Sequence, residues 1–138
     1  MTLFAPLAGP SDGDGLSVDL DPALLAFVKC HVTSALKWEA LRVLAAQEGR
    51  WLCADDLARA THRDLGAVTS ALAELSAEGV VDELPGASPG ETRYRLPAYE
   101  PTTVVLRRLI AAATHSRELR SVIACHLLRN RNAQAPAF

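Results

Sequence analysis

The sequence predicts a mostly α-helical protein that carries one small β-hairpin. Two short amphipathic helices follow one another between residues 54 and 79, separated by the polar turn Thr61-His62-Arg63. Gly79 ends the second helix, and the apolar pair Val80-Val81 then begins a strand. A return strand, Thr92–Leu96, follows a run of turn-forming residues. Two crossed helices followed by a hairpin form a winged helix-turn-helix, a scaffold used mostly to hold one helix in the DNA major groove.

Length and composition limit the protein class. The chain has 138 residues, enough for one domain with a buried core, and its 49 % apolar content favours helices because it is poor in aromatic side chains. It contains no apolar run near the roughly 18 residues that a membrane span needs. The first residues form no basic or apolar leader, so we expect a cytoplasmic protein with no membrane partner. Three scattered cysteines, Cys30, Cys53 and Cys125, fit reduced thiols better than a disulfide framework.

The net charge of −2 hides an uneven distribution. Residues 1–100 hold 8 Lys and Arg against 15 Asp and Glu, a balance of −7, whereas residues 101–138 hold 6 Arg against one Glu, a balance of +5. Such a division is typical of a basic tail for nucleic acid or of an Arg-rich surface for an acidic protein partner. It also fits two surfaces of one homodimer that attract each other. All three interpretations stay open.

The chain begins with a segment that differs in composition from the rest. Residues 1–20 combine Pro and Gly with the stretch Ser11–Gly15, which predicts a flexible arm. Asp21-Pro22 then offers an N-cap acid and a proline at the first helical position. We therefore expect an N-terminal helix over residues 21–33.

A second helix is expected from Ala35 to about Glu48. Ser34 can cap its start, and Gly49 can end it. Its apolar residues lie on two nearly opposite sides, so the helix must contact two surfaces. One is the domain core, and the other is supplied by the terminal helices or by a second subunit.

The predicted winged helix-turn-helix domain spans residues 34–97. A short strand at Arg50-Trp51-Leu52 precedes Cys53, which takes the N-cap position of the helix that begins at Ala54. Asp64 can cap the following helix. The buried side of that helix is predicted from helical spacing and consists of Leu65, Val68, Ala71, Leu72 and Leu75.

Residues 98–130 are expected to form a C-terminal helical segment that serves dimerisation. Glu100-Pro101 begins it, and apolar residues then recur at helical spacing. Ser116 could begin a new helical segment, so the sequence leaves open whether residues 102–130 form one kinked helix or two. Residues 131–138 are expected to fray.

Four short segments carry a resemblance to a known family. They are Leu57-Ala58-Arg59-Ala60 before the turn, the spaced residues Val68, Leu72 and Leu75, Glu78-Gly79-Val80-Val81 after the second helix, and Tyr94-Arg95-Leu96 at the close of the wing. Over about residues 34–97 the chain resembles the winged helix-turn-helix transcriptional regulators of bacteria, particularly the MarR-like and ArsR-like groups. The resemblance implies a homodimer that binds double-stranded DNA, with the terminal helices forming the dimer.

Several polar residues near the motif are candidates for DNA contact. Phosphate contacts supply most of the affinity of such proteins, and arginine is a suitable donor. Thr69 and Ser70 lie where the second helix would read base edges, and Lys37 on the preceding helix is a further candidate for contact with the DNA backbone. The predicted DNA-binding residues are Arg59, Arg63, Thr69, Ser70, Arg93 and Arg95.

Charge along the second helix supports a rival hypothesis. Between Asp64 and Glu78 the chain has three acids and no base, and the hairpin tip Pro85–Gly90 has no Lys or Arg. The alternative is a winged helix that has lost DNA binding and instead docks a protein. Its flat docking face would consist of Gly66, Ser70, Ala73, Glu74 and Ala77.

Metal binding and catalysis lack a supporting pattern. Cys30-His31 and Cys125-His126 place neighbours about 100° apart on a helix, which is not the spacing of zinc ligands. The sequence has no phosphate-binding glycine loop, nucleophile elbow or paired carboxylates around a predicted cleft. We therefore expect no metal, no cofactor and no enzymatic activity.

Overall fold

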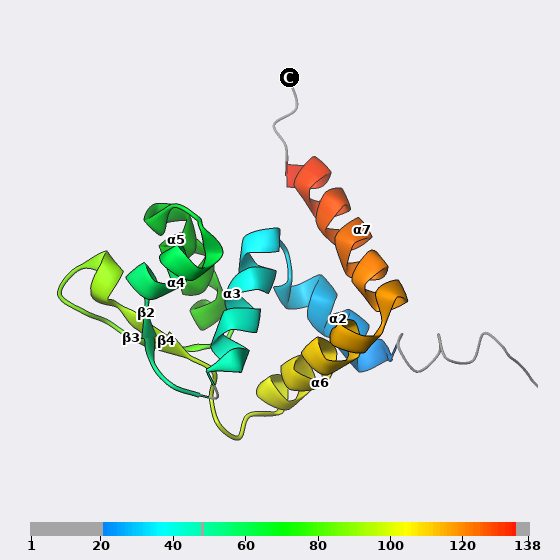
Figure 1. The fold of residues 1–138 in the computed structure, drawn as a ribbon, viewed down its shortest axis with the longest axis horizontal. Helices are drawn as coiled ribbons and strands as arrows, with labels where there is room; N and C mark the ends of the chain where they lie inside the picture. The colour runs from blue at the N-terminus through cyan, green and yellow to red at the C-terminus, as the bar shows by residue number, and fades with distance from the viewer. Residues whose placement is uncertain (1–20, 48, 135–138) are drawn as a thin grey trace, which may run out of the picture.

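The computed structural model in Figure 1 describes residues 21–47 and 49–134, without the side chains of residues 132–134. The predicted arm at residues 1–20 and the end of the predicted tail, residues 135–138, lie outside this range. The elements are α2 (Pro22–His31), α3 (Ala35–Ala46), β2 (Leu52–Cys53), α4 (Ala54–Thr61), α5 (Leu65–Ala77), β3 (Asp82–Leu84), the 3-10 turn η2 (Pro89–Glu91), β4 (Arg93–Arg95), α6 (Pro101–His115) and α7 (Arg117–Gln134).

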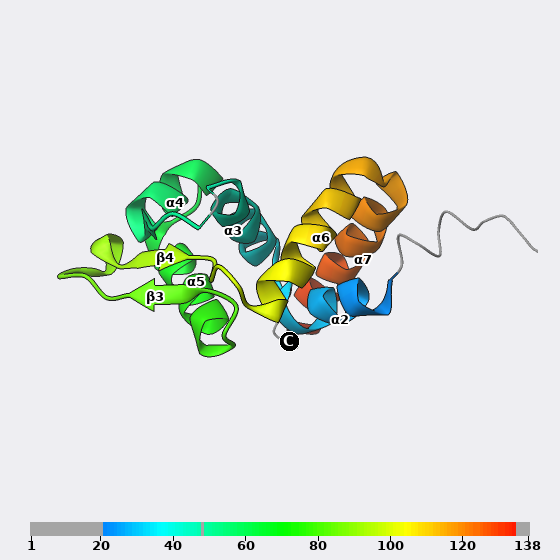
Figure 2. The same ribbon diagram turned by 90° about the horizontal axis from the view of Figure 1, so that it is seen from below.

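The elements form two lobes (Figure 2). The first contains α3, α4, α5 and an antiparallel sheet of order β2-β4-β3, and the second contains α2, α6 and α7. Within the first lobe α3, α4 and α5 pack on one another, and in the second α6 packs on both α2 and α7. The first lobe is a winged helix-turn-helix in which β3 and β4 form the wing, so the predicted fold class is confirmed. In the part of the chain that the structure describes, no helix combines the length and the hydropathy of a membrane span.

Local chemistry sets the helix ends close to their predicted positions. The side chains of Asp21, Ser34 and Asp64 each accept a hydrogen bond from a backbone N–H in the first turn of the following helix. Such caps satisfy donors that have no partner inside the helix. Gly49 and Gly79 take φ values of +83° and +80°. These left-handed conformations let the chain leave α3 and α5 without the strain that a side chain would add.

The C-terminal segment, for which the sequence left open one kinked helix or two, forms two helices. Ser116 separates α6 from α7 with extended dihedral angles, φ −118° and ψ 111°. Its hydroxyl accepts a hydrogen bond of 3.0 Å from the N–H of Leu119, and so caps α7. Helix α7 continues to Gln134, so the prediction that the chain frays from residue 131 is wrong for residues 131–134.

A single cluster of buried apolar residues runs through both lobes. The predicted buried residues of α5 other than Leu65 are enclosed, and Leu72 and Leu75 are fully buried. One side of α3 packs on α4 and α5, and on its other side Trp38 lines a pocket together with Ile110 of α6. The second apolar side of α3 thus lies toward the C-terminal helices.

Asp21 links the start of α2 to α6 and makes stability sensitive to acid. Its carboxylate accepts from the N–H of Ala23 and pairs with Arg108 at 2.7 Å. The backbone hydrogen bond and then Arg108 hold the pKa of Asp21 below its ordinary value of 3.8. The stabilisation is therefore present above that ordinary value and is lost as the pH falls through the lowered pKa.

We expect Asp21→Asn to flatten this dependence, because asparagine is also a good N-cap but carries no charge. The measurement is the midpoint of thermal unfolding between about pH 3 and pH 7. The variant should have a lower midpoint than the wild type at neutral pH, and the difference should shrink below about pH 4. Parallel curves over the whole range would contradict the role of the charge.

Candidate nucleic-acid interface

A tight turn places Arg63 beside the start of α5. His62 takes a left-handed conformation, φ 56°, and its N–H bonds to the carbonyl of Arg59. The N–H of Arg63 bonds to the carbonyl of Ala58 at 3.1 Å, which closes the end of α4. Asp64 then caps α5. The arginine side chain is therefore presented where the N-terminal end of α5 meets solvent.

The outer surface of α5 consists mostly of small side chains. Its exposed members in the first three turns are Gly66, Ala67, Ser70, Ala73 and the acidic Glu74. Thr69 is half-buried, and its hydroxyl donates to the carbonyl of Gly66 at 3.0 Å. Helix α5 contains no Lys or Arg. This surface can enter a groove closely but attracts phosphate only through residues outside the helix.

Two predicted phosphate contacts are held by carboxylates of the same chain. Arg63 pairs with Glu39 of α3 at 2.8 Å, and Arg59 pairs with Asp56 one turn earlier on α4. The two arginine side chains are 41 % and 72 % exposed. Ion pairs so open to water contribute about 0–1 kcal/mol, so a phosphate group can replace the carboxylate.

The other two predicted arginines lie on a different surface. Alternate side chains of a strand face opposite sides, and Tyr94 between them is buried against the helices. Arg93 and Arg95 therefore lie on the outer face of the sheet. Arg95 pairs with Asp82 across the strands at 3.2 Å, and its guanidinium lies 4.4 Å from the ring centre of Trp51. The structure brings Arg63, Thr69 and Ser70 together at α5 and leaves the wing arginines apart from them.

The wing has a defined shape. Burial raises the pKa of Tyr94 to about 12, and the carboxylate of Glu83 on the neighbouring strand adds to the rise. The buried phenol ring anchors β4. A Cβ atom added to Gly86 would lie 2.5 Å from the backbone oxygen of Glu91, so this turn requires glycine.

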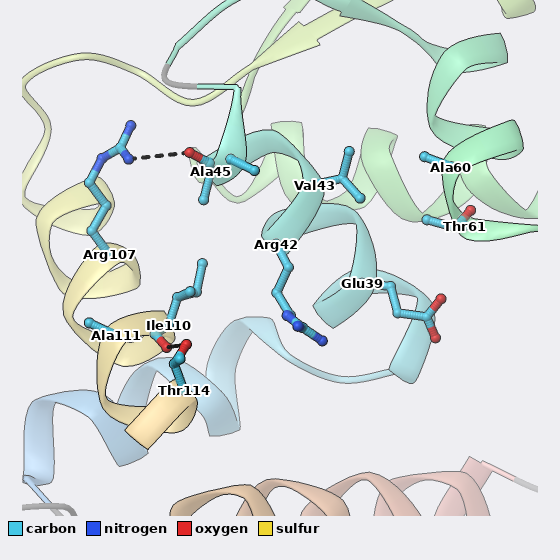
Figure 3. A pocket seen from close by; sticks show the side chains of 11 residues that line it. Glu39, Arg42, Val43, Ala45, Ala60, Thr61, Arg107, Ile110, Ala111 and Thr114 are labelled. Carbon is cyan, nitrogen blue, oxygen red and sulfur yellow. Dashed lines mark hydrogen bonds between the residues drawn. The ribbon is translucent and has the colours of Figure 1, made fainter. Parts of the chain in front are cut away.

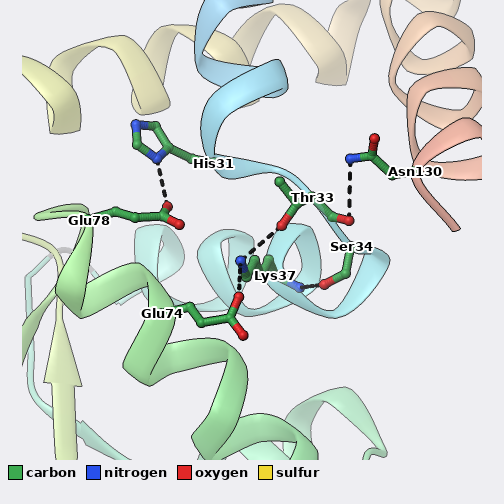
Figure 4. A network of polar contacts seen from close by, with 7 residues as sticks. All are labelled: His31, Thr33, Ser34, Lys37, Glu74, Glu78 and Asn130. Carbon is green, nitrogen blue, oxygen red and sulfur yellow. Dashed lines mark hydrogen bonds and ion pairs between the residues drawn. The ribbon is translucent and has the colours of Figure 1, made fainter. Parts of the chain in front are cut away.

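The structure contradicts the suggestion that Lys37 reaches a DNA backbone. Lys37 is only 4 % exposed, and its ammonium group contacts Thr33 Oγ1 at 2.9 Å and Glu74 Oε1 at 2.6 Å (Figure 4). The partner Glu74 lies on α5, far along the chain. The sequence carries no sign of this pair, because helical spacing relates residues within one helix only.

A groove of about 640 Å³ opens between α3, α4 and α6 (Figure 3). Its walls are mostly apolar: Val43 points from α3 toward Ala60 and Thr61 of α4, and Ile110 lines the wall on the α6 side, while Arg42 and Glu39 come from α3. Glu39 is also the partner of Arg63, so the groove borders the candidate interface. No sequence signal pointed to it, since three separate helices supply its lining.

Among the residues that the structure describes, no three His, Cys, Asp or Glu side chains gather as a metal site. Cys30 and Cys125 are exposed. Cys53 takes the predicted N-cap position of α4, and its thiol donates to the Asp56 carboxylate at 3.1 Å. His126 uses its Nε2 atom to contact the carbonyl of Val32 at 3.0 Å.

Comparison with known proteins finds two similar solved structures. No protein-family model and no curated protein matches the chain. BpsR of Bordetella bronchiseptica, whose DNA binding is regulated by 6-hydroxynicotinic acid, is 17 % identical with a TM-score of 0.46, over 93 % of this chain and 100 % of that one. NadR, solved in complex with 4-hydroxyphenylacetate, is 21 % identical with a TM-score of 0.40, over 92 % of this chain and 95 % of NadR.

Proposed function

We propose that this chain is a bacterial, cytoplasmic winged helix-turn-helix protein that binds double-stranded DNA as a homodimer and regulates transcription. The observation that carries the proposal is the exposed, low surface of the first turns of α5, with Arg63 directly beside its start. A helix of this shape fits the major groove, and a cation at its end lies where the phosphate backbone passes.

The predicted residues take different roles in this proposal. Thr69 and Ser70 approach base edges, where a hydroxyl group can donate or accept a hydrogen bond. Arg59 and Arg63 exchange their carboxylate partners for phosphates. Arg93 and Arg95 on the outer face of the wing contact phosphates further along the duplex, so the complex is positioned from both sides of α5.

The second lobe provides the proposed dimer surface. Val104 and Leu128 are 54 % and 58 % exposed, unusual values for large apolar side chains. Leu128 also borders a mostly apolar groove between α7 and the segment Thr33–Ala35. Exposed apolar surface of this kind supports an interface with a second copy, which would place two α5 helices on one duplex.

A protein-docking module is the second candidate function. It is favoured by the lack of any base on α5 and by the carboxylates that already hold Arg59, Arg63 and Arg95. In that case the small side chains of α5 would contact a protein. An acidic partner would then bind the Arg-rich C-terminal segment.

A DNA titration at several salt concentrations separates the two candidates. The probe is a fluorescently labelled duplex of mixed sequence, and two chains are expected to bind per site. If each chain uses two to four arginines, the logarithm of the binding constant should fall with the logarithm of salt with a slope of about −4 to −7. Absence of binding even at about 50 mM salt would reject the DNA proposal and favour protein docking.

A further inference from the structure

Residues 32–34 form the corner between α2 and α3. Polar contacts at this corner and in the adjoining turns of α2 and α3 connect them to α5, the proposed recognition helix (Figure 4). Glu74 and Glu78 lie one turn apart along the C-terminal half of α5 and its end. Glu74 pairs with Lys37 just after the corner, and Glu78 contacts His31 Nδ1 at 2.8 Å just before it. Both acids of the helix are thus engaged by the same short stretch of chain.

Helix α7 holds this corner from the opposite side. His126 Nε2 lies 3.0 Å from the carbonyl oxygen of Val32, and Asn130 Nδ2 lies 3.3 Å from the same ring nitrogen. Asn130 Nδ2 reaches the carbonyl of Thr33 at 3.5 Å. The hydroxyl of Thr33 in turn accepts from Lys37 Nζ at 2.9 Å. A continuous series of polar contacts therefore runs from α7 through the corner to α5.

Lys37 is the central residue of this series of polar contacts because it is buried. Its side chain is 5 % exposed, whereas that of Glu74 is 60 % exposed. A buried ammonium group needs its partners far more than an exposed carboxylate does, since removal of the partner leaves a charge without compensation. The lysine therefore restricts where α5 can lie relative to α3, and water cannot easily replace Glu74.

We propose that this corner is a polar joint that transmits the position of α7 to the recognition helix, with Lys37 as a positioning residue for α5. Its consequence for DNA rests on the function proposed above, whereas the joint itself is independent of DNA. A change at α7, such as assembly with a second copy, would alter the placement of α5 through Val32, Thr33 and Lys37. Lys37 acts here without touching the duplex.

A double-mutant cycle on the intact chain tests the joint without DNA. His126→Leu removes the contact of α7 with the corner, and Glu74→Gln weakens the pair on α5; the two side chains share no contact. If the joint couples α7 to α5, the two substitutions should not act independently. The change in the unfolding equilibrium constant of the double variant should then differ from the product of the two single-variant changes by more than about threefold. This coupling should disappear in a Lys37→Met background and persist with His126→Gln, which keeps a donor.

The proposal is overturned if, with Lys37 present, the product of the two single-variant changes in the unfolding equilibrium constant lies within about twofold of the change in the double variant. Independent sites are additive to that degree. Retention of the coupling after Lys37→Met would also overturn it. Neither result depends on whether the chain binds DNA, so failure of the joint and failure of the proposed function remain distinct.

Binding of the labelled duplex supplies a second test. For Glu74→Gln, loss of charge repulsion and loss of the positioning contact predict opposite changes in DNA affinity. Removing a negative charge near DNA should tighten binding, and Glu91→Gln on the wing serves as the control for that effect. As part of the joint, Glu74→Gln should instead weaken binding, by about 2- to 30-fold. The salt slope should not change, because no phosphate contact is lost. Tighter binding, as in the control, would reject the positioning role.

Discussion

Truncation of Leu72 to alanine is expected to lower the free energy of unfolding by about 2–5 kcal/mol. Leu72 lies in the middle of α5 and is fully buried. Helix α5 packs on both α3 and α4, so the residue is surrounded by side chains that cannot collapse fully into the space left behind. The loss combines the transfer energy of the removed atoms with the penalty for a cavity.

Urea unfolding measures this effect through the midpoint and the slope of the transition. The neighbouring variant Ala73→Ser is the matched control, since Ala73 is exposed on the same helix and should change stability by no more than about 0.5 kcal/mol. A loss below about 1 kcal/mol at Leu72 would be incompatible with a well-packed α5.

Replacement of Arg63 by alanine is expected to have the largest effect of any single surface change on DNA affinity. Arg63 is the arginine closest to the start of α5, and the tight turn at His62 fixes its backbone there. A charge-assisted hydrogen bond contributes about 1.5–3 kcal/mol, so binding at low salt should weaken by at least about tenfold. The salt slope should become shallower by about one for each chain bound.

Two further variants make the experiment on Arg63 specific. Glu39→Gln removes the carboxylate that competes with phosphate for Arg63 and should tighten binding by up to about fivefold, the value of an exposed ion pair. Arg42→Ala on α3 removes an exposed arginine that lines the groove and should leave the slope unchanged. An unchanged slope for Arg63→Ala would remove this residue from the interface.

The local parts of the fold could be predicted because their causes are local. Asp21, Ser34 and Asp64 cap helices by bonding to N–H groups a few residues away, and Gly79 ends α5 through its own dihedral freedom. The apolar spacing of α5 predicted its buried side correctly except at half-exposed Leu65, since the period of a helix relates sequence directly to direction. The turn residues between residues 85 and 90 placed the wing correctly, but its first strand begins at Asp82 and not at Val80-Val81 as predicted.

The candidate site was predictable only in part. Helical spacing predicted that Arg63 lies in the turn before the second helix and that Thr69 and Ser70 lie on that helix. The structure places all three at α5. It did not show that Glu39 would hold Arg63, or that Arg95 would lie on Trp51 on the outer face of the sheet. These pairs join residues from separate elements, and their geometry depends on how the elements pack.

The sequence alone therefore determined the order of the helices and strands, the capped starts of α2, α3 and α5, and most of the buried side of α5. Only the tertiary structure decided which charges meet, that Lys37 is buried, and that residues 101–134 break into two helices at Ser116. The physical reason is the range of the interactions. Caps and helical periodicity act within a few residues, whereas a buried charge finds its partner through the packing of whole elements.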